Sequence, residues 1–322
     1  MNTKPRLECE QIHCHPDTGC ALGEMLSDCP HYASSNTEGS ETVVSPSVDG
    51  LGVPWSGSEF GLDDIAWVAS RQRPTLLVPV GAHNAGKTTF LASLYIGLLR
   101  GAKPEGWELL GSYSLGGWEK LASYLRHAPD GIGPGFPPHT PVTDKRTPGW
   151  LHLGFRNTEE QVRDLLLADA PGEWFSQWAI DVNDSTAEGA RWAANRGDVF
   201  LFFVDSDGLA SSDRRNVAEQ LELLANRMSG VLDNRPLAVV WAKSDKEIPQ
   251  TLREDVELAL NNAFPDSKHF QTTVFNSGND SEPTQQFWDV LDWCVSHGGP
   301  TSRKLPPLAS VNPADPFLSF RG

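Results

Sequence analysis

The sequence predicts an α/β fold in which a mostly parallel, six-stranded sheet lies between helices on both faces, giving three layers. Two observations indicate this. Short apolar runs, which suit buried strands, alternate along the chain with longer segments of helical periodicity. The first run, residues 75–80, is followed by a glycine-bounded loop and then by a helical pattern at residues 90–99. Strands that alternate with helices in this way usually pair in parallel.

Composition and charge limit the class of protein. The 322-residue chain is 39% hydrophobic, enough for a substantial core, and its net charge of −16 argues against non-specific binding to nucleic acid or anionic lipid. No run of about 18 apolar residues is present, so no membrane span is expected. Residues 1–9 lack the apolar core of a signal peptide. These features together predict a cytoplasmic protein.

The N-terminal region differs in composition from the rest. Four of the five cysteines fall within the first 29 residues, a density that suggests a structural zinc site in a leader of residues 1–32. The spacing is irregular, and a flexible leader without metal is the alternative. The predicted zinc ligands are Cys9, Cys14, Cys20 and Cys29, with His13, His15 or His31 as substitutes. Residues 33–58 are predicted to be a linker, residues 59–298 the folded domain, and residues 299–322 a tail rich in Pro and Ser.

The loop after the first strand carries the strongest chemical signal. Gly81 and Gly86 allow the backbone to turn sharply around a diphosphate, and the following helix directs its N-terminus at the phosphates. Lys87 is placed to reach the β- and γ-phosphates, and the Thr88 hydroxyl to hold Mg²⁺. The alternative is an ordinary glycine turn before a helix. The predicted phosphate contacts are Gly81, His83, Asn84, Ala85, Gly86, Lys87, Thr88 and Thr89.

The remaining elements follow from periodicity. Two runs joined by a short polar segment are predicted to pair as a hairpin, and a Gly- and Pro-rich loop of residues 129–149 precedes them. The expected strands are residues 75–80, 150–155, 164–169, 199–204, 237–241 and 271–275. The expected helices are residues 90–99, 118–127, 187–195, 213–228, 247–264 and 284–297.

Acidic residues follow several of these strands. Asp169 ends the second strand of the predicted hairpin, at the sheet edge that carries the phosphate loop, where it is placed to hold Mg²⁺. Gly172 can offer its N–H to a γ-phosphate. Asp245 follows the run at 237–241 and can accept two hydrogen bonds from guanine, while the Lys243 stem lies over the purine. A lysine and an aspartate in an ordinary loop are the alternative. Asp205 and Asp207 are predicted to form a turn and helix cap.

With these motifs in place, the chain resembles a P-loop GTPase of the Ras-like, translation-factor-related (TRAFAC) class. The resemblance covers roughly residues 75–297 and rests on four motifs in the family's order. It is most similar to the double-GTPase modules of bacterial conflict systems. The motifs are Gly81 to Thr88, Asp169 to Gly172, Ala242 to Asp245, and Ser277 with Gly278, whose loop is expected to present N–H groups to the purine.

The resemblance implies Mg²⁺ held by Thr88, Asp169 and a switch threonine, for which Thr147 is chosen over Thr140 and Thr143 because it lies just before the hairpin. It also implies catalytic roles for Lys87, Gly172 and Glu173.

The chain departs from the family's pattern at three positions. Ala242 replaces a residue that usually tethers the base-binding loop to the phosphate loop, and Glu173 stands where the family has a water-positioning glutamine. His83 replaces a small residue and could crowd a partner's arginine finger.

The sequence therefore predicts a cytoplasmic molecular switch that binds GTP and GDP with Mg²⁺ and hydrolyses GTP slowly without a partner. Trp174, Phe175 and Trp178 follow Glu173 and either anchor a protein partner or pack as core. Two rival functions remain: a nucleotide-binding scaffold that does not hydrolyse, and an ATPase or kinase built on the same loop.

Overall fold

The computed structural model describes residues 6–9, 32–35, 59–126, 147–274 and 282–298, and it divides into two compact units, Met1–Val53 and Pro54–Gly322. Within the first unit, strands β1 (Arg6–Cys9) and β2 (Tyr32–Ser35) pair antiparallel, with Cys9 opposite Tyr32. β2 spans the boundary predicted between leader and linker. The other three predicted zinc ligands lie outside the described residues.

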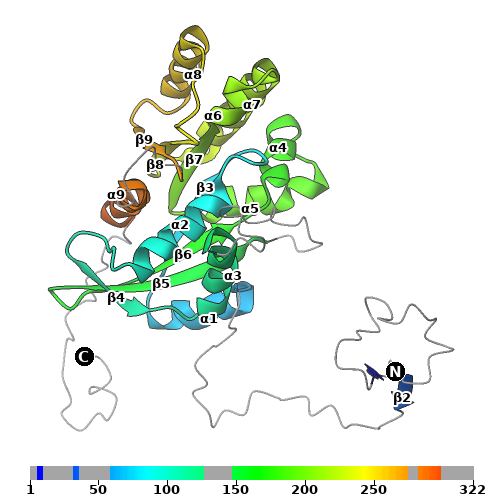
Figure 1. Ribbon diagram of the computed structural model, residues 1–322, viewed down its shortest axis with the longest axis vertical. Coiled ribbons are helices and arrows are strands. Elements are labelled where there is room, and N and C mark those ends of the chain that lie inside the picture. The colour runs from blue at the N-terminus through cyan, green and yellow to red at the C-terminus, as the bar shows by residue number, and fades with distance from the viewer. Residues whose placement is uncertain (1–5, 10–31, 36–58, 127–146, 275–281, 299–322) are drawn as a thin grey trace, which may run out of the picture. The chain divides into compact units, whose positions relative to one another are not determined.

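The second unit is built on a seven-stranded mixed sheet with the order β4-β5-β6-β3-β7-β8-β9 (Figure 1). Five strands run parallel to one another, and β4 and β5 complete the sheet through antiparallel pairing. The strands are β3 (Thr75–Val80), β4 (Trp107–Gly111), β5 (Gly149–Asn157), β6 (Val162–Asp169), β7 (Val199–Asp205), β8 (Leu237–Ala242) and β9 (Lys268–Thr272).

The strand count corrects the six-stranded prediction, because β4 was not expected. β4 is an edge strand whose central residues are exposed, and its pairing with β5 is irregular between Leu109 and Gly111. Its sequence therefore shows no alternation of apolar and polar residues that would predict a strand. The predicted hairpin is confirmed, with Gly149 opposite Asp169 and Arg156 opposite Val162. The last strand begins and ends three residues earlier than predicted, because its pairing with β8 stops at Thr272.

The helices agree with the predicted segments to within about four residues, and three further helices were not predicted: α1, α4 and the short α6. The helical elements are α1 (Leu62–Arg71), α2 (Lys87–Leu99), α3 (Leu115–Arg126), α4 (Gly172–Ile180), η1 (Ser185–Ala187), α5 (Glu188–Arg196), α6 (Ser206–Ala210), α7 (Arg214–Leu232), α8 (Gln250–Ala263) and α9 (Glu282–His297).

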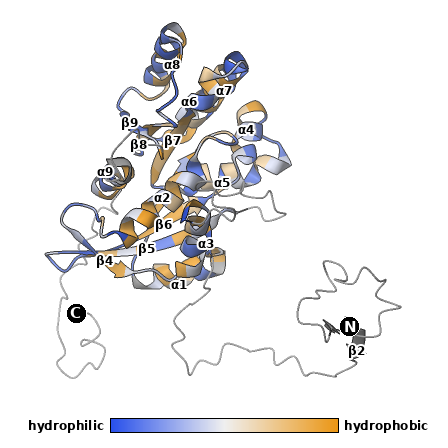
Figure 2. Ribbon diagram, viewed as in Figure 1, coloured by the Kyte–Doolittle hydropathy of each residue, from blue (hydrophilic) through white to orange (hydrophobic). Residues whose placement is uncertain are grey.

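Alternating side chains of the central strands divide the core between the two faces of the sheet. Phe200 and Phe202 of β7 pack in one cluster with residues of α4, α5, α7 and α8, whereas Leu201 and Phe203 pack in the other with α2, α3 and α9. The central strands are buried on both faces, and Figure 2 shows β6 and β7 largely in the hydrophobic colour. The predicted three-layer arrangement follows from this period-two pattern.

The three aromatic residues after Glu173 belong to this core. Trp174, Phe175 and Trp178 are 4%, 0% and 2% exposed on α4, and they pack in the cluster that contains α5 and α7. Of the two alternatives, interface anchors or core, the structure therefore has the second. Their burial fixes α4 against the sheet, directly after the carboxyl end of β6.

Gly189 of α5 gives a test of this packing. A Cβ at Gly189 would lie 2.3 Å from Cε3 of Trp174, so Gly189→Ala is expected to lower the free energy of unfolding by about 1–3 kcal/mol through overpacking. Gly230→Ala in α7 is the matched control, because nothing lies within 4 Å of its added Cβ and alanine favours a helix by about 1 kcal/mol. Urea unfolding of both variants measures the difference; equal stabilities would contradict the packing described.

Candidate functional site

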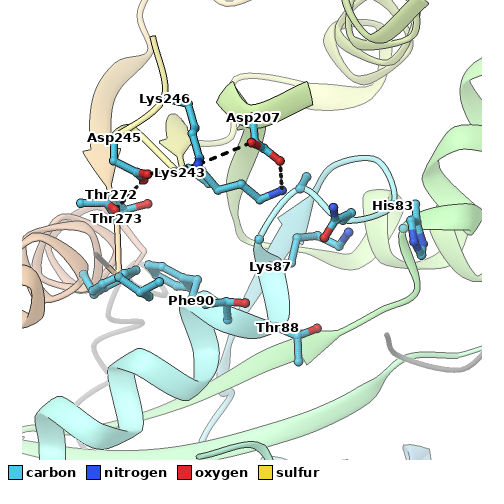
Figure 3. Close-up of a pocket in the computed structure, with 18 of the residues that line it drawn as sticks. His83, Lys87, Thr88, Phe90, Asp207, Lys243, Asp245, Lys246, Thr272 and Thr273 are labelled. Carbon is cyan, nitrogen blue, oxygen red and sulfur yellow. Dashed lines mark hydrogen bonds and ion pairs between the residues drawn. The ribbon is translucent and has the colours of Figure 1, made fainter. Parts of the chain in front are cut away.

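The carboxyl ends of the five parallel strands meet at one edge of the sheet, and a cleft of about 500 Å³ lies there. Residues that follow β3, β6, β7, β8 and β9 line it. Figure 3 shows Lys87 near the middle of the cleft, with His83 toward one end and Asp245 toward the other. The volume falls within the range typical of small-molecule sites, and ligands of open α/β sheets bind at this edge.

The phosphate loop predicted from the sequence forms one wall. Its two glycines are required for different reasons: a Cβ on Gly81 would lie 3.0 Å from the Cβ of Phe203, whereas Gly86 has a left-handed φ of 92°. Asn84 is also left-handed, with a φ of 60°. Helix α2 begins at Lys87, so its unpaired amides face the cleft. This is the geometry of an anion-binding loop.

Lys87 is the cation at the centre of the cleft, and its side chain is buried. Its ammonium donates hydrogen bonds to the carbonyl oxygens of Gly81 and Ala82, each at 2.9 Å. Burial lowers the pKa of Lys87 from 10.5 to about 8, and the nearby carboxylates of Asp169, Glu173 and Asp205 oppose that change. Within the described part of the chain its hydrogen-bond acceptors are these two carbonyl oxygens, and such a buried ammonium is suited to an anionic ligand.

Asp169 and Thr88 lie together at the start of α2. The Thr88 hydroxyl donates to Oδ1 of Asp169 at 3.1 Å, and the carboxylate is buried at the carboxyl end of β6. A hydroxyl and a carboxylate at this distance supply the oxygen ligands that Mg²⁺ prefers. Thr147 lies two residues before Gly149, which pairs with Asp169, and Thr147 is not among the described residues that line the cleft.

Gly172 brings the start of α4 against the phosphate loop. A Cβ on Gly172 would lie 2.4 Å from the His83 backbone nitrogen and 2.5 Å from the Ala82 carbonyl oxygen, so only glycine permits this approach. The next residue, Glu173, has its Oε1 2.7 Å from Nδ1 of His83. Both side chains are partly exposed, at 40% and 45%.

The far end of the cleft holds the predicted base-binding residues. Asp245 accepts a hydrogen bond from the Thr273 hydroxyl at 2.7 Å, and Lys243 has a left-handed φ of 56°, a strained conformation common at functional sites. Phe90, Val274 and Phe287 add an apolar wall. Ser277, Gly278 and the two remaining candidate threonines lie outside the described residues.

Asp205 corrects one prediction. α6 begins at Ser206 as a cap at Asp205 would require, yet the Asp205 side chain makes no capping hydrogen bond and lies 2.9 Å from Nζ of Lys243. Asp207, which was also predicted as part of the turn and cap, lies 4.0 Å from the same ammonium and lines the cleft (Figure 3). Lys246 lines the cleft too and was not predicted. The sequence did hold a signal for both residues: each lies a few positions after the carboxyl end of a buried parallel strand, where ligands of such sheets bind.

Ala242 lies under the phosphate loop. A Cβ on Gly86 would lie 3.1 Å from the Ala242 Cβ, so the two loops approach closely at this point. Alanine has no polar side chain, so the side-chain tether that the resemblance implies is absent at residue 242.

The described residues lack both a cluster of metal-binding side chains and a membrane-spanning helix. Within these ranges no group of three or more His, Cys, Asp or Glu side chains is arranged to hold a metal ion. No helix among them is long and apolar enough to cross a membrane.

Comparison with known proteins places the chain in a family. Residues 76–294 match the Double-GTPase 2 family, and the chain belongs to it. The match includes the phosphate loop, Asp169 to Glu173, and Ala242 to Asp245. The protein is therefore a member of a GTPase family with a P-loop α/β domain, as the sequence predicted.

Solved structures with some likeness include two of Era. One is Era in complex with MgGDPNP and nucleotides of 16S ribosomal RNA, at 16% identity and a TM-score of 0.37, covering 72% of this chain and 59% of that chain. The other is an Aquifex aeolicus Era variant bound to GDP·AlF4⁻, at 14% identity and a TM-score of 0.34, covering 70% and 57%. The chain thus spans less than two thirds of either Era chain. Comparison with curated proteins gives no match.

The pKa of Lys87 makes stability depend on pH. Between pH 8 and 10.5 the unfolded chain binds more protons than the folded one at this residue, so the wild type should gain stability relative to Lys87→Met as pH rises through that window. The full gain is about 3 kcal/mol. Urea unfolding without nucleotide and with a chelator, at pH 7, 9 and 10, measures it. Parallel curves for the two proteins would show that Lys87 is not desolvated.

Proposed function

We propose that this protein binds GTP in the cleft and hydrolyses it to GDP and inorganic phosphate, acting as a nucleotide-dependent switch. The observation that carries the proposal is the meeting, in one cleft, of the Lys87 phosphate loop with the Lys243–Asp245 loop in a member of a GTPase family.

The phosphate end supports triphosphate binding. Two helices, α2 and α4, begin at the cleft, so their first amides and the positive ends of their dipoles are directed toward a bound anion. Lys87 would exchange its carbonyl partners for β- and γ-phosphate oxygens. Gly172 is the first residue of α4, where an amide has no intrahelical partner, and its N–H would donate to the γ-phosphate.

Thr88 and Asp169 fit a magnesium ion by the chemistry of their oxygens, 3.1 Å apart. When bound, Mg²⁺ would neutralise charge on the β- and γ-phosphates and fix their orientation. Because Asp169 already pairs with Thr88, the protein holds both groups in place before the nucleotide binds.

The base end supports guanine. A carboxylate accepts hydrogen bonds through both oxygens, and the Thr273 hydroxyl orients the Asp245 carboxylate while leaving it capacity for more donors. Guanine presents two N–H donors on one edge, whereas adenine does not. Asp205 holds the Lys243 ammonium, so the apolar stem of this lysine can lie along the purine.

Hydrolysis in this site rests mainly on positioning. Glu173, at the cleft and beside the phosphate loop, would accept a hydrogen bond from the attacking water, in the place of the family's glutamine. Lys87 would stabilise charge on the transferring phosphoryl group. After phosphate leaves, the Gly172 N–H at the start of α4 would lose its phosphate contact, and this loss would be the signal of a switch.

Base recognition is tested by calorimetric binding of GTP, GDP, ATP and XTP with Mg²⁺ to the wild type and Asp245→Asn. The wild type should bind GTP at least tenfold more tightly than ATP, and the variant should lose about tenfold to hundredfold in GTP affinity and gain xanthine binding. Asp255→Asn, an exposed aspartate on α8, is the matched control and should bind as the wild type does. Equal binding of ATP and GTP would favour an ATPase instead.

The metal site is tested by Thr88→Val, which removes one hydroxyl at constant shape. We expect Mg²⁺ to raise wild-type GTP affinity by about tenfold, or about 1.4 kcal/mol, and this gain to disappear in the variant. In EDTA the two proteins should bind GTP alike, which serves as the control for folding. A variant that keeps the full Mg²⁺ dependence would remove Thr88 from the metal site.

A further inference from the structure

The hydrogen bond between His83 and Glu173 joins the two segments that would enclose the γ-phosphate. His83 lies in the phosphate loop and Glu173 in the first turn of α4, 90 residues later, with Nδ1 and Oε1 2.7 Å apart. Both residues line the cleft. A carboxylate only accepts hydrogen bonds, so an ionised Glu173 requires the hydrogen to be on Nδ1 of His83.

The backbone around the pair leaves it little freedom. Gly172 approaches the Ala82–His83 backbone as closely as an absent Cβ allows, and Trp174 and Phe175 anchor the other side of Glu173 in the core. The Glu173 backbone is therefore fixed on both sides. Its long side chain still has rotamer freedom, and the bond to His83 selects one position for the carboxylate.

The charge of Glu173 explains why such a partner matters. The carboxylate lies close enough to Lys87 to raise the pKa of that lysine, which places it near the group that would hold the γ-phosphate. An unpaired carboxylate there would be free to turn toward the Lys87 ammonium or away from the phosphate into solvent. The imidazole N–H instead draws it to the face of the phosphate loop that carries His83.

We propose that His83 is a positioning residue for GTP hydrolysis: its Nδ1–H holds the Glu173 carboxylate where it orients the attacking water. This rests on the proposed function. In the step, the water oxygen bonds to the γ-phosphorus and the bond to the β–γ bridging oxygen breaks. GDP leaves with the electron pair, and the water proton ends on a phosphate oxygen. Glu173 aligns the water, and His83 acts only through Glu173.

The test is single-turnover phosphate release together with direct measurement of GTP affinity. His83→Ala should lower the hydrolysis rate by about tenfold to hundredfold, because the Glu173 carboxylate would no longer be held where it aligns the attacking water. GTP affinity should change by less than about threefold. His83→Asn, whose amide can donate a similar hydrogen bond, should restore most of the rate. His297→Ala, an exposed histidine at the end of α9, is the matched control and should hydrolyse GTP as the wild type does.

A double-mutant cycle separates this role from any other. In a Glu173→Ala background, His83→Ala should have no further effect on the rate. An equal loss in that background, failure of His83→Asn to restore the rate, or an unchanged rate in His83→Ala would each overturn the inference and leave GTP hydrolysis standing. A wild type that binds GTP without turnover would overturn the inference and leave GTP binding standing, whereas failure to bind GTP would overturn the proposed function itself. Urea unfolding confirms that each variant is folded.

Discussion

The buried ammonium of Lys87 is the interaction on which the rest of the site depends. Placing a cation at the edge of the sheet is costly, and the carbonyl oxygens of Gly81 and Ala82 offset only part of that cost. Asp169 and Asp205, at the ends of the two strands that flank β3, and Glu173 on α4 supply opposite charge. The parallel sheet makes this possible, because it delivers several chain segments to one edge.

Close backbone approach is the second constraint. Gly81 packs on Phe203 and Gly86 lies beside Ala242, where an added Cβ would be tightly crowded, and Gly172 packs on the phosphate loop, where no Cβ fits. These contacts bring the loop that follows β3 against strand β7, the end of β8 and the start of α4. Closely packed segments of this kind move together, so a displacement of the phosphate loop would also displace the start of α4.

Elements whose own residues carry a strong pattern were predictable. The strands at the centre of the sheet are continuous apolar runs, and the β5–β6 hairpin joins an alternating run to a continuous one through a polar turn. β4 was missed because it is stabilised by pairing with β5, which its own sequence does not reveal. α4 was missed although its own sequence is strongly apolar. Trp174, Phe175 and Trp178 fit an exposed interface as well as a core, and only the neighbouring helices show that they are buried.

For the site, the sequence by itself determined the residues that must meet special local demands: glycines at Gly81, Gly86 and Gly172, the lysine at the start of α2, and acids at strand ends. Gly86 is required by its own left-handed φ, and the other residues were identified by their places in motifs whose order along the chain the sequence shows. Only the tertiary structure decided which side chains meet, including Asp205 with Lys243 and His83 with Glu173. Such pairs join segments far apart in the chain, and their distances depend on the order and stagger of strands, which no local pattern encodes.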